Sequence, residues 1–165
     1  MVKGCTARRQ NYVPTRDAVL RAVAERCLEE YAALTAEAAS GAGPADRDEL
    51  TAFFRTLLEN VAGPGRPRLL AYLELQAEAA RRPWLSALLD PMASGDFAGF
   101  EAAQRSAGLP VTRRRAATFT LALHAAIPQL LGGGPDTLAA AGLDDLDRFD
   151  RGLLDAVYPA DATPA

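Results

Sequence analysis

The side chains able to carry out chemistry are few and far apart in the sequence. The chain of 165 residues contains one histidine, His124, and two cysteines, Cys5 and Cys27. One histidine excludes most catalytic triads and most zinc sites, and the cysteines have neither CxxC spacing nor a metal-type spacing to His124. The sequence contains no GxSxG, no HExxH and no glycine-rich loop followed by lysine and serine. No pair of carboxylates is singled out either, so we predict no enzyme, no metal site and no cofactor.

The side chains best suited to bind a small molecule are aromatic and polar groups on helices. Gln76 lies in an apolar stretch and could hold a polar group of a ligand, although it could equally be exposed. His124 could contact a ligand, but a lone histidine on a buried helix is usually hydrogen-bonded core. Aromatic residues at helical spacing are more often simple packing than pocket lining. The candidate ligand-binding set is Phe54, Leu57, Tyr72, Gln76, Trp84, Leu88, Phe119 and His124.

Two clusters of charge are better explained by solvation than by binding. The segment 113–115 is three arginines at an expected helix start, and a solvated cluster paired with acids is favoured over a nucleic-acid patch on a chain of net charge −3. The acidic run Asp144, Asp145, Asp147 and Asp150 lacks the glycine and the spacing of a calcium loop. We interpret this acidic run as helix-capping charge.

Overall charge and hydropathy favour a cytoplasmic protein without a membrane span. A net charge of −3 gives no general attraction to phosphate backbones, and Lys3, Arg8 and Arg9 are too few to change this. The two unpaired cysteines fit a reducing compartment, and no secretory signal opens the chain. The most apolar run, Ala116 to Leu131, is shorter than the roughly 20 residues that a span requires. We therefore interpret that run as a buried helix.

The candidate side chains depend on helices for their positions, and the first helix has a well-marked start. Pro14 disfavours helix at the residue before it, Thr15 can cap the first turn, and Asp17 places negative charge at the positive end of the helix dipole. The helix is expected over Thr15–Ala39. Apolar residues at spacings of three and four predict one core-facing side: Leu20, Val23, Cys27, Tyr31 and Leu34.

Further helices follow, separated by glycine and proline. One opens at Asp46, with Glu49 completing a capping box, and stops at Gly63; the next starts near Pro67 and ends or kinks at Pro83. After these we expect a section through Trp84–Met92, a short helix over Phe97–Ala103, a long helix from Thr112 to Leu131, and a last helix that Gly142 could divide. No long alternating apolar and polar run predicts a strand, so the fold is expected to be an all-α multi-helix bundle.

The stretch Asn11–Leu20, NYVPTRDAVL, resembles the end of the DNA-binding domain in tetracycline-repressor-like (TetR family) regulators. Gly4, Cys5 and Thr6 resemble the entry to the recognition helix, one residue closer to Asn11 than is usual, and Val13 replaces a usual phenylalanine. The two helices that precede this motif in the family are absent from the sequence. The resemblance implies that residues 1–14 are a remnant of a helix-turn-helix domain, with Thr6, Asn11 and Tyr12 as remnant DNA-binding residues.

The order of the helices resembles the regulatory half of the same family. That resemblance implies a ligand-binding and dimerisation domain over residues 15–158 and a disordered tail over 159–165. It also implies a homodimer in which the segments 113–131 and 143–157 pair with their copies as a four-helix bundle. Small residues in the first segment allow close helix approach, although it could also be the buried helix of a monomer. The implied interface is Ala116, Thr120, Leu123, Ile127, Leu146, Phe149 and Leu153.

Two hypotheses about function follow. In the first, the chain is the effector-binding and dimerisation portion of a TetR-like transcriptional regulator. Its effector is a small apolar molecule, and DNA binding, impaired in these 165 residues, belongs only to a full-length form. In the second, the chain is a freestanding helical module that binds a small molecule or another protein without binding DNA. The effector, the operator and the regulated genes cannot be read from the sequence.

Overall fold

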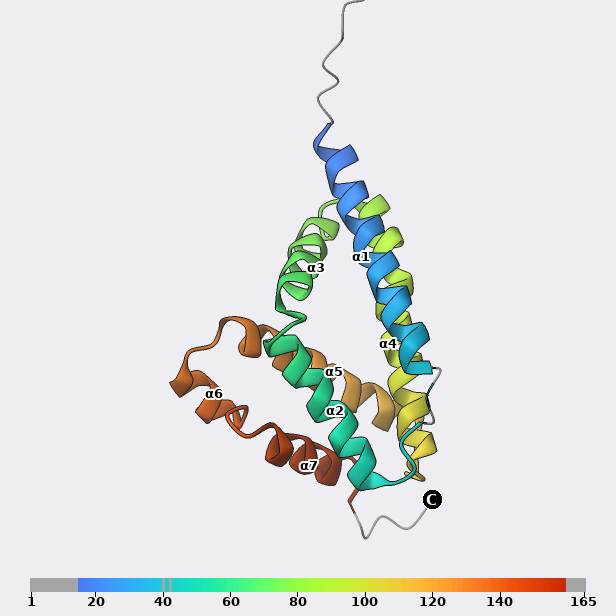
Figure 1. Ribbon diagram of the computed structural model, residues 1–165, viewed down its shortest axis with the longest axis vertical. Helices are drawn as coiled ribbons and strands as arrows, with labels where there is room; N and C mark the ends of the chain where they lie inside the picture. Colours follow the sequence, from blue (N-terminus) through green and yellow to red (C-terminus); the bar gives the residue numbers. More distant parts are fainter. Residues whose placement is uncertain (1–14, 40, 42, 160–165) are drawn as a thin grey trace, which may run out of the picture.

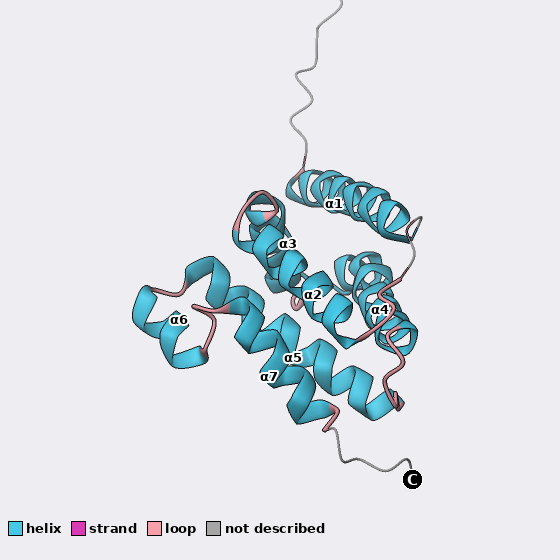
Figure 2. Cartoon of the chain, turned by 60° about the horizontal axis from the view of Figure 1, so that its bottom comes forward, coloured by secondary structure: helices cyan, strands magenta, loops and turns pink. Residues whose placement is uncertain are grey.

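The computed structural model describes residues 15–39, 41 and 43–159, with residues 34–39 described by their backbone alone. Seven α-helices and no strand occur in this part of the chain (Figure 1, Figure 2). They are α1 (Arg16–Ala39), α2 (Arg47–Ala62), α3 (Arg66–Ala79), α4 (Pro83–Ser106), α5 (Arg113–Gly132), α6 (Pro135–Ala141) and α7 (Leu146–Val157). The all-α prediction is confirmed. The predicted remnant with Thr6, Asn11 and Tyr12, and residues 160–165 of the predicted tail, lie outside the described residues.

The helices begin where side chains can satisfy the free amides of the first turn. The carboxylate of Asp46 accepts from Glu49 N at 2.9 Å, and Glu49 reaches back to Ala45 N at 2.8 Å. The Thr112 hydroxyl oxygen likewise accepts a hydrogen bond from Arg115 N, at 3.2 Å, and so caps the start of α5. Each such cap contributes about 1 kcal/mol to a helix. Among the described helices, none is long and apolar enough to cross a membrane.

Helix α4 differs from its prediction. The sequence predicts a section ending near Met92 and a separate short helix from Phe97, whereas one helix runs through Pro91 and Gly95. Proline and glycine both weaken a helix, but buried residues on either side of them, such as Leu89 and Phe100, lie along one packed face. Packing against neighbouring helices therefore overrides the local breakers.

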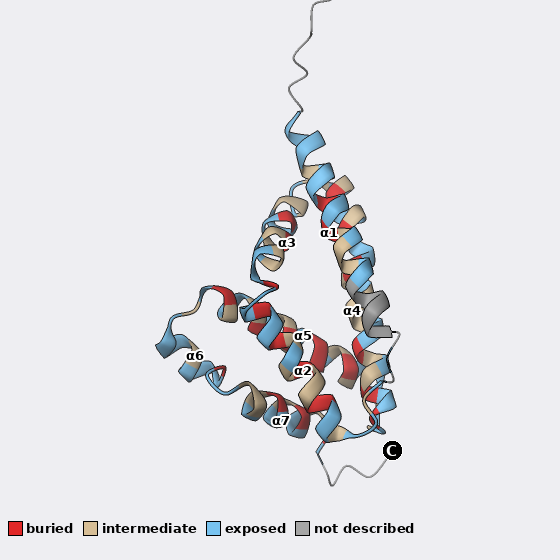
Figure 3. Cartoon of the chain, viewed as in Figure 1, coloured by how far each residue is buried: buried red, intermediate tan, exposed pale blue. Residues whose placement is uncertain are grey.

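Two hydrophobic cores hold the helices together. The α1–α3–α4 core contains Ala24, Cys27, Tyr72, Leu75, Leu85, Leu89 and Met92. The α2–α5–α7 core contains Leu50, Phe54, Leu58, Phe100, Ala107, Phe119, Leu123, Leu154 and Tyr158. Helix α4 contributes to both and packs against α1, α3 and α5, so it joins the two halves (Figure 1). In Figure 3 the buried positions lie on the sides of the helices that face these cores.

The core-facing side of α1 differs from the predicted side at one position, because Leu20, Cys27 and Tyr31 face the core as predicted but Val23 does not. Ala24 is completely buried, whereas Val23, which the spacing placed in the core, is 40% exposed. Helix α1 therefore packs through Leu20, Ala24 and Cys27 and leaves Val23 at its edge. At the other end of the chain, Gly142 adopts a left-handed conformation (φ 70°) and separates α6 from α7. Gly142 therefore divides the last predicted helix in two, as the sequence indicated that it could.

Candidate functional site

The structure divides the predicted ligand-binding residues between the two cores. Phe54 and Phe119 are completely buried with ring centroids 4.8 Å apart, and Leu57 packs against the same α2–α5–α7 core. The members that belong to the other core, or pack against it, are Tyr72, Trp84 and Leu88. The eight residues therefore do not line one common pocket.

Polar side chains connect the two cores where α1, α4 and α5 meet. The Tyr31 hydroxyl on α1 donates to Oδ1 of Asp96 on α4 at 2.7 Å, and Nε2 of His124 on α5 lies 3.3 Å from Oδ2 of Asp96. The His124 ring lies edge-on to Phe97, with centroids 5.8 Å apart. One carboxylate thus joins three helices. We call Tyr31, Tyr72, Gln76, Asp96 and His124 the polar seam.

Helix α3 adds the remaining two members of the polar seam. Gln76 Nε2 donates to the Tyr72 hydroxyl at 2.9 Å, while the rest of the Gln76 side chain is exposed. Burial, and then the Asp96 carboxylate, raises the pKa of Tyr72 above its ordinary value. The same two causes, with the hydrogen bond to Asp96, raise the pKa of Tyr31. Both phenols therefore stay protonated near neutral pH and can donate hydrogen bonds.

Sequence reasoning missed two members of this group. The sequence pattern places Tyr31 only in an apolar stripe, and no motif singles out Asp96. The available signal was a single carboxylate between Gly95 and Phe97, within a helix that is otherwise apolar on that side. Its partner Tyr31 lies 65 residues away in sequence, and no local pattern specifies that contact.

An open groove lies between α1 and the beginning of α3. Its volume is about 730 Å³, and its walls include the partly exposed Val19 and Val23, with Pro67 and Ala71 opposite. A second hollow of about 470 Å³ adjoins it and shares Val23 and Ala71. None of the eight predicted ligand-binding residues lines either hollow.

The predicted dimer residues fall into two groups. Ala116, Thr120 and Leu123 are buried by the chain's own helices, since α5 packs against α2, α4 and α7. The partly exposed ones are Ile127, Leu146, Phe149 and Leu153. Leu121, which the prediction did not include, is 58% exposed on α5. A second copy could therefore reach only part of the predicted set without repacking the chain.

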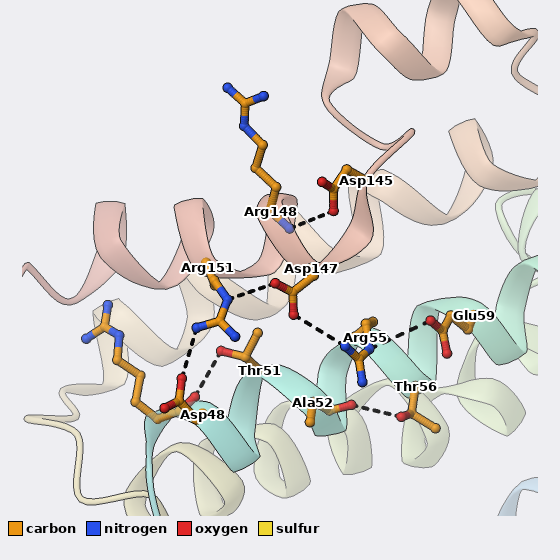
Figure 4. Close-up of polar contacts among 11 residues, drawn as sticks. Asp48, Thr51, Ala52, Arg55, Thr56, Glu59, Asp145, Asp147, Arg148 and Arg151 are labelled. Carbon is orange, nitrogen blue, oxygen red and sulfur yellow. Dashed lines mark hydrogen bonds and ion pairs between the residues drawn. The ribbon is translucent and has the colours of Figure 1, made fainter.

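Ion pairs join α2 to α7 (Figure 4). Arg151 bonds to Asp147 at 2.8 Å on its own helix and to Asp48 of α2 at 2.9 Å, and Arg55 of α2 lies 3.4 Å from Asp147. The Arg151 hydrogen bond is the main cause that lowers the pKa of Asp147. These pairs lie in contact with solvent, so each of them contributes little to stability. Their role here is to align α7 on α2.

The acidic run of α7 is only partly the capping charge that the sequence predicted. Asp145 does cap the helix, because it accepts from Arg148 N at 3.0 Å. Asp150, by contrast, is completely buried, and neither carboxyl oxygen has a hydrogen-bond partner among the described residues. Burial, with a smaller effect of Asp147, raises the pKa of Asp150 to about 7. The interpretation of Asp150 as capping charge is wrong, because α7 turns that side chain into the core.

No metal site is formed by the residues that the structure describes. Among them, no three histidine, cysteine, aspartate or glutamate side chains come together as metal ligands. Asp96 and His124 are a pair without a third such ligand. The polar seam can therefore offer a carboxylate, two phenols, an amide and an imidazole to a small molecule, rather than a coordination shell.

Comparison with known proteins places this arrangement in a family. No curated protein and no solved structure matches the chain significantly. A family model described as the C-terminal domain of tetracyclin repressor-like proteins matches residues 45–156, which is more than half of the chain. The match extends from just before α2 almost to the end of α7. It includes four of the five residues of the polar seam, all except Tyr31. The chain therefore belongs to the TetR family and carries its C-terminal domain.

Proposed function

We propose that this chain is the effector-binding and dimerisation portion of a TetR-like transcriptional regulator. The family match over residues 45–156 and the all-helical fold support a regulatory role. C-terminal domains of this family belong to regulators rather than enzymes, and we propose that this chain is likewise not an enzyme. A regulator of transcription works where the genome is, which agrees with the cytoplasmic prediction.

The observation that best supports an effector role is the link from Tyr31 through Asp96 to His124. It ties α1 to α5 across the seam between the cores. Helix α1 directly follows the stretch that resembles the end of a DNA-binding domain. A ligand that binds better to one arrangement of α1 on α4 shifts the population toward that arrangement. Movement of α1 is then the output of the sensing domain.

We place the effector site at the polar seam and the adjoining α1–α3–α4 core. Tyr72, Gln76 and His124 offer polar groups there, and Trp84 and Leu88 offer apolar surface. Phe54, Leu57 and Phe119 pack the neighbouring core and, in this proposal, hold α5 and His124 in position. A mostly apolar site with a few convergent polar groups is typical of small-molecule binding.

We further propose a homodimer formed by α5 and α7. Leu121 offers a large exposed apolar side chain on α5, and Ile127, Phe149 and Leu153 are partly exposed on the two helices. Removal of such surface from water at roughly 25 cal/mol per Å² favours association. Ala116, Thr120 and Leu123, which are buried, would lie beneath this surface and pack α5 against the rest of its own chain.

For the 165-residue chain we propose no sequence-specific DNA binding, because a recognition helix needs supporting helices to hold it in the major groove. A gel-shift experiment with this chain tests the point, and specific retardation would contradict it. The effector role is tested by thermal unfolding with a varied library of small apolar molecules. A binding molecule should raise the Tm of the wild type and lose most of this effect in Leu88→Ala, while the exposed change Leu70→Ala should leave the effect intact.

A further inference from the structure

Asp96 is a half-buried carboxylate that pairs with no arginine of the described residues. Its side chain is only 22% exposed, and within the described part of the chain His124 is the one basic side chain at ion-pair distance. Glu78, which is buried to a similar extent, is paired with Arg16, Arg81 and Arg82. Burying a carboxylate costs free energy unless a cation or several hydrogen bonds compensate. Within the described residues, only the hydrogen bond from Tyr31 and the contact with His124 compensate the burial of the Asp96 carboxylate.

Aromatic side chains lie close to Asp96 or to its partner His124. Tyr31 is hydrogen-bonded to it, the charge of Asp96 acts on Tyr72, and the rings of Phe97 and Phe100 lie edge-on to His124 at 5.8 and 6.2 Å. The face of an aromatic ring attracts a cation at distances within about 6 Å. Such contacts occur elsewhere in the chain, since the Arg21 guanidinium lies 4.6 Å from the Trp84 ring centroid and that of Arg115 lies 5.8 Å from the Tyr158 ring centroid. A carboxylate among aromatic rings is a suitable environment for an organic cation.

The same surroundings do not suit a metal ion. Hard divalent cations take six or more oxygen ligands, often from several carboxylates, and zinc takes three or four nitrogen, sulfur or oxygen ligands. Within the described residues, Asp96 and His124 have no third ligating side chain beside them. His124 is 30% exposed at its side chain, so solvent reaches the pair. An ammonium or amidinium group needs one carboxylate and apolar neighbours, and these are present.

We propose that Asp96 binds the positively charged head group of an organic cation, an amine or amidine with an apolar body. This inference rests on the effector-binding role proposed above and gives the effector its chemical class. The cation takes the place of the Tyr31 hydroxyl as the partner of Oδ1, and its apolar body packs into the α1–α3–α4 core. Binding thereby breaks the hydrogen bond that holds α1 on α4. The head group is thus linked to the position of α1.

The test compares head groups on matched bodies. The probes are 2-phenylethylamine, 2-phenylethanol and phenylacetate, together with octylamine, octanol and octanoate, each measured by calorimetry and by thermal unfolding with the 165-residue chain. The variants are Asp96→Asn, which keeps an oxygen acceptor for Tyr31, and Asp90→Asn, a control on an exposed aspartate of the same helix. Circular dichroism of each variant without ligand verifies folding.

We expect at least one amine to bind about tenfold or more tightly than its alcohol and its acid, as a charge-assisted contact requires. Asp96→Asn should remove this advantage and Asp90→Asn should keep it. Tyr31→Phe, which leaves the carboxylate free of its competitor, should bind the amine at least as tightly as the wild type. An amine advantage that survives in Asp96→Asn, or alcohols that bind as tightly as amines, would overturn the cation assignment and leave the effector role standing. If no probe of the three classes binds, the cation assignment is overturned. If, separately, no molecule of the wider library raises the Tm, the effector role is overturned.

Discussion

Tyr31 and Asp96, 65 residues apart in sequence, are joined by a hydrogen bond of 2.7 Å that fastens α1 to α4. The donor is a partly buried phenol and the acceptor is a carboxylate, a combination stronger than a hydrogen bond between neutral groups. The bond lies in the first helix after the stretch that resembles a DNA-binding domain, and it is therefore well placed to control how α1 sits on the rest of the fold.

The first prediction concerns the loss of that bond. Tyr31→Phe keeps the ring and removes the hydroxyl, so Asp96 loses a donor. We expect the free energy of unfolding to fall by about 1–3 kcal/mol, the range for a lost hydrogen bond to a charged group. Urea unfolding followed by circular dichroism measures it. Val19→Ala, a change at a partly exposed position of the same helix, serves as the control. An unchanged midpoint in Tyr31→Phe would show that α1 is held without this bond.

Two glycines of α4 provide a matched pair for the contact between α1 and α4. A Cβ at Gly95 would lie 3.1 Å from the Tyr31 hydroxyl oxygen, while a Cβ at Gly99 would have nothing within 4 Å. Alanine in a helix interior is favoured over glycine by about 0.5–1 kcal/mol. Gly99→Ala should therefore stabilise the protein by about this amount. Gly95→Ala should be less stable than Gly99→Ala, because Tyr31 has to shift. Equal gains in thermal unfolding would contradict the close approach at Gly95.

Asp150 predicts a dependence of stability on pH. Burial raises the pKa of this carboxyl to about 7, whereas in the unfolded chain it is about 3.9. Between these values the folded state holds a proton that the unfolded state has released, so the free energy of unfolding falls as pH rises. The stabilisation is complete below about pH 4 and is lost as pH rises through 7.

The variant Asp150→Asn removes this titration while keeping the shape of the side chain. Relative to the wild type, it should gain stability steadily from pH 4 to pH 7, by roughly 1 kcal/mol per pH unit at most. Asp147→Asn is the control, because the pKa of that ion-paired residue is lowered instead of raised. Denaturant unfolding at pH 5, 6, 7 and 8 measures the difference. A constant difference across this range would mean that Asp150 is not buried as described.

Much of the fold could be predicted because its signals are local. Proline at the start of α4, threonine before α5 and the glycine between α6 and α7 each act on the backbone of a few neighbouring residues. These effects do not depend on the rest of the chain. Helix starts and stops were therefore largely predictable, as was the absence of an alternating pattern for strands.

The remaining features depend on contacts between distant segments. Whether α1 buries Val23 or Ala24 is decided by how α1 lies on α3 and α4, and both side chains fit an apolar stripe at helical spacing. The continuity of α4 through Pro91 depends on packing on both sides of it. Burial of Asp150 likewise comes from α7 lying on α2 and α5. The polar seam combines four helices, so its members could be proposed one by one but not assembled.

Leu121 offers a direct variant for the proposed dimer. It is 58% exposed on α5, so Leu121→Glu should leave the fold of one chain intact. If α5 forms the contact between copies, a buried glutamate without a partner costs several kcal/mol and should dissociate the dimer at micromolar concentration. Leu70→Glu, on α3, should leave the solution mass unchanged. Equal masses for Leu121→Glu and wild type would place any dimer contact elsewhere.

The central claim, that this chain is the effector-binding and dimerisation domain of a TetR-family regulator, is tested most directly by its mass in solution. Light scattering coupled to size exclusion at micromolar concentration measures this mass without a ligand. We predict a particle of twice the 17.5 kDa of one chain. A monomer at every concentration up to about 100 micromolar, well above the roughly 1 micromolar dissociation constant that corresponds to −8.2 kcal/mol, would contradict the account.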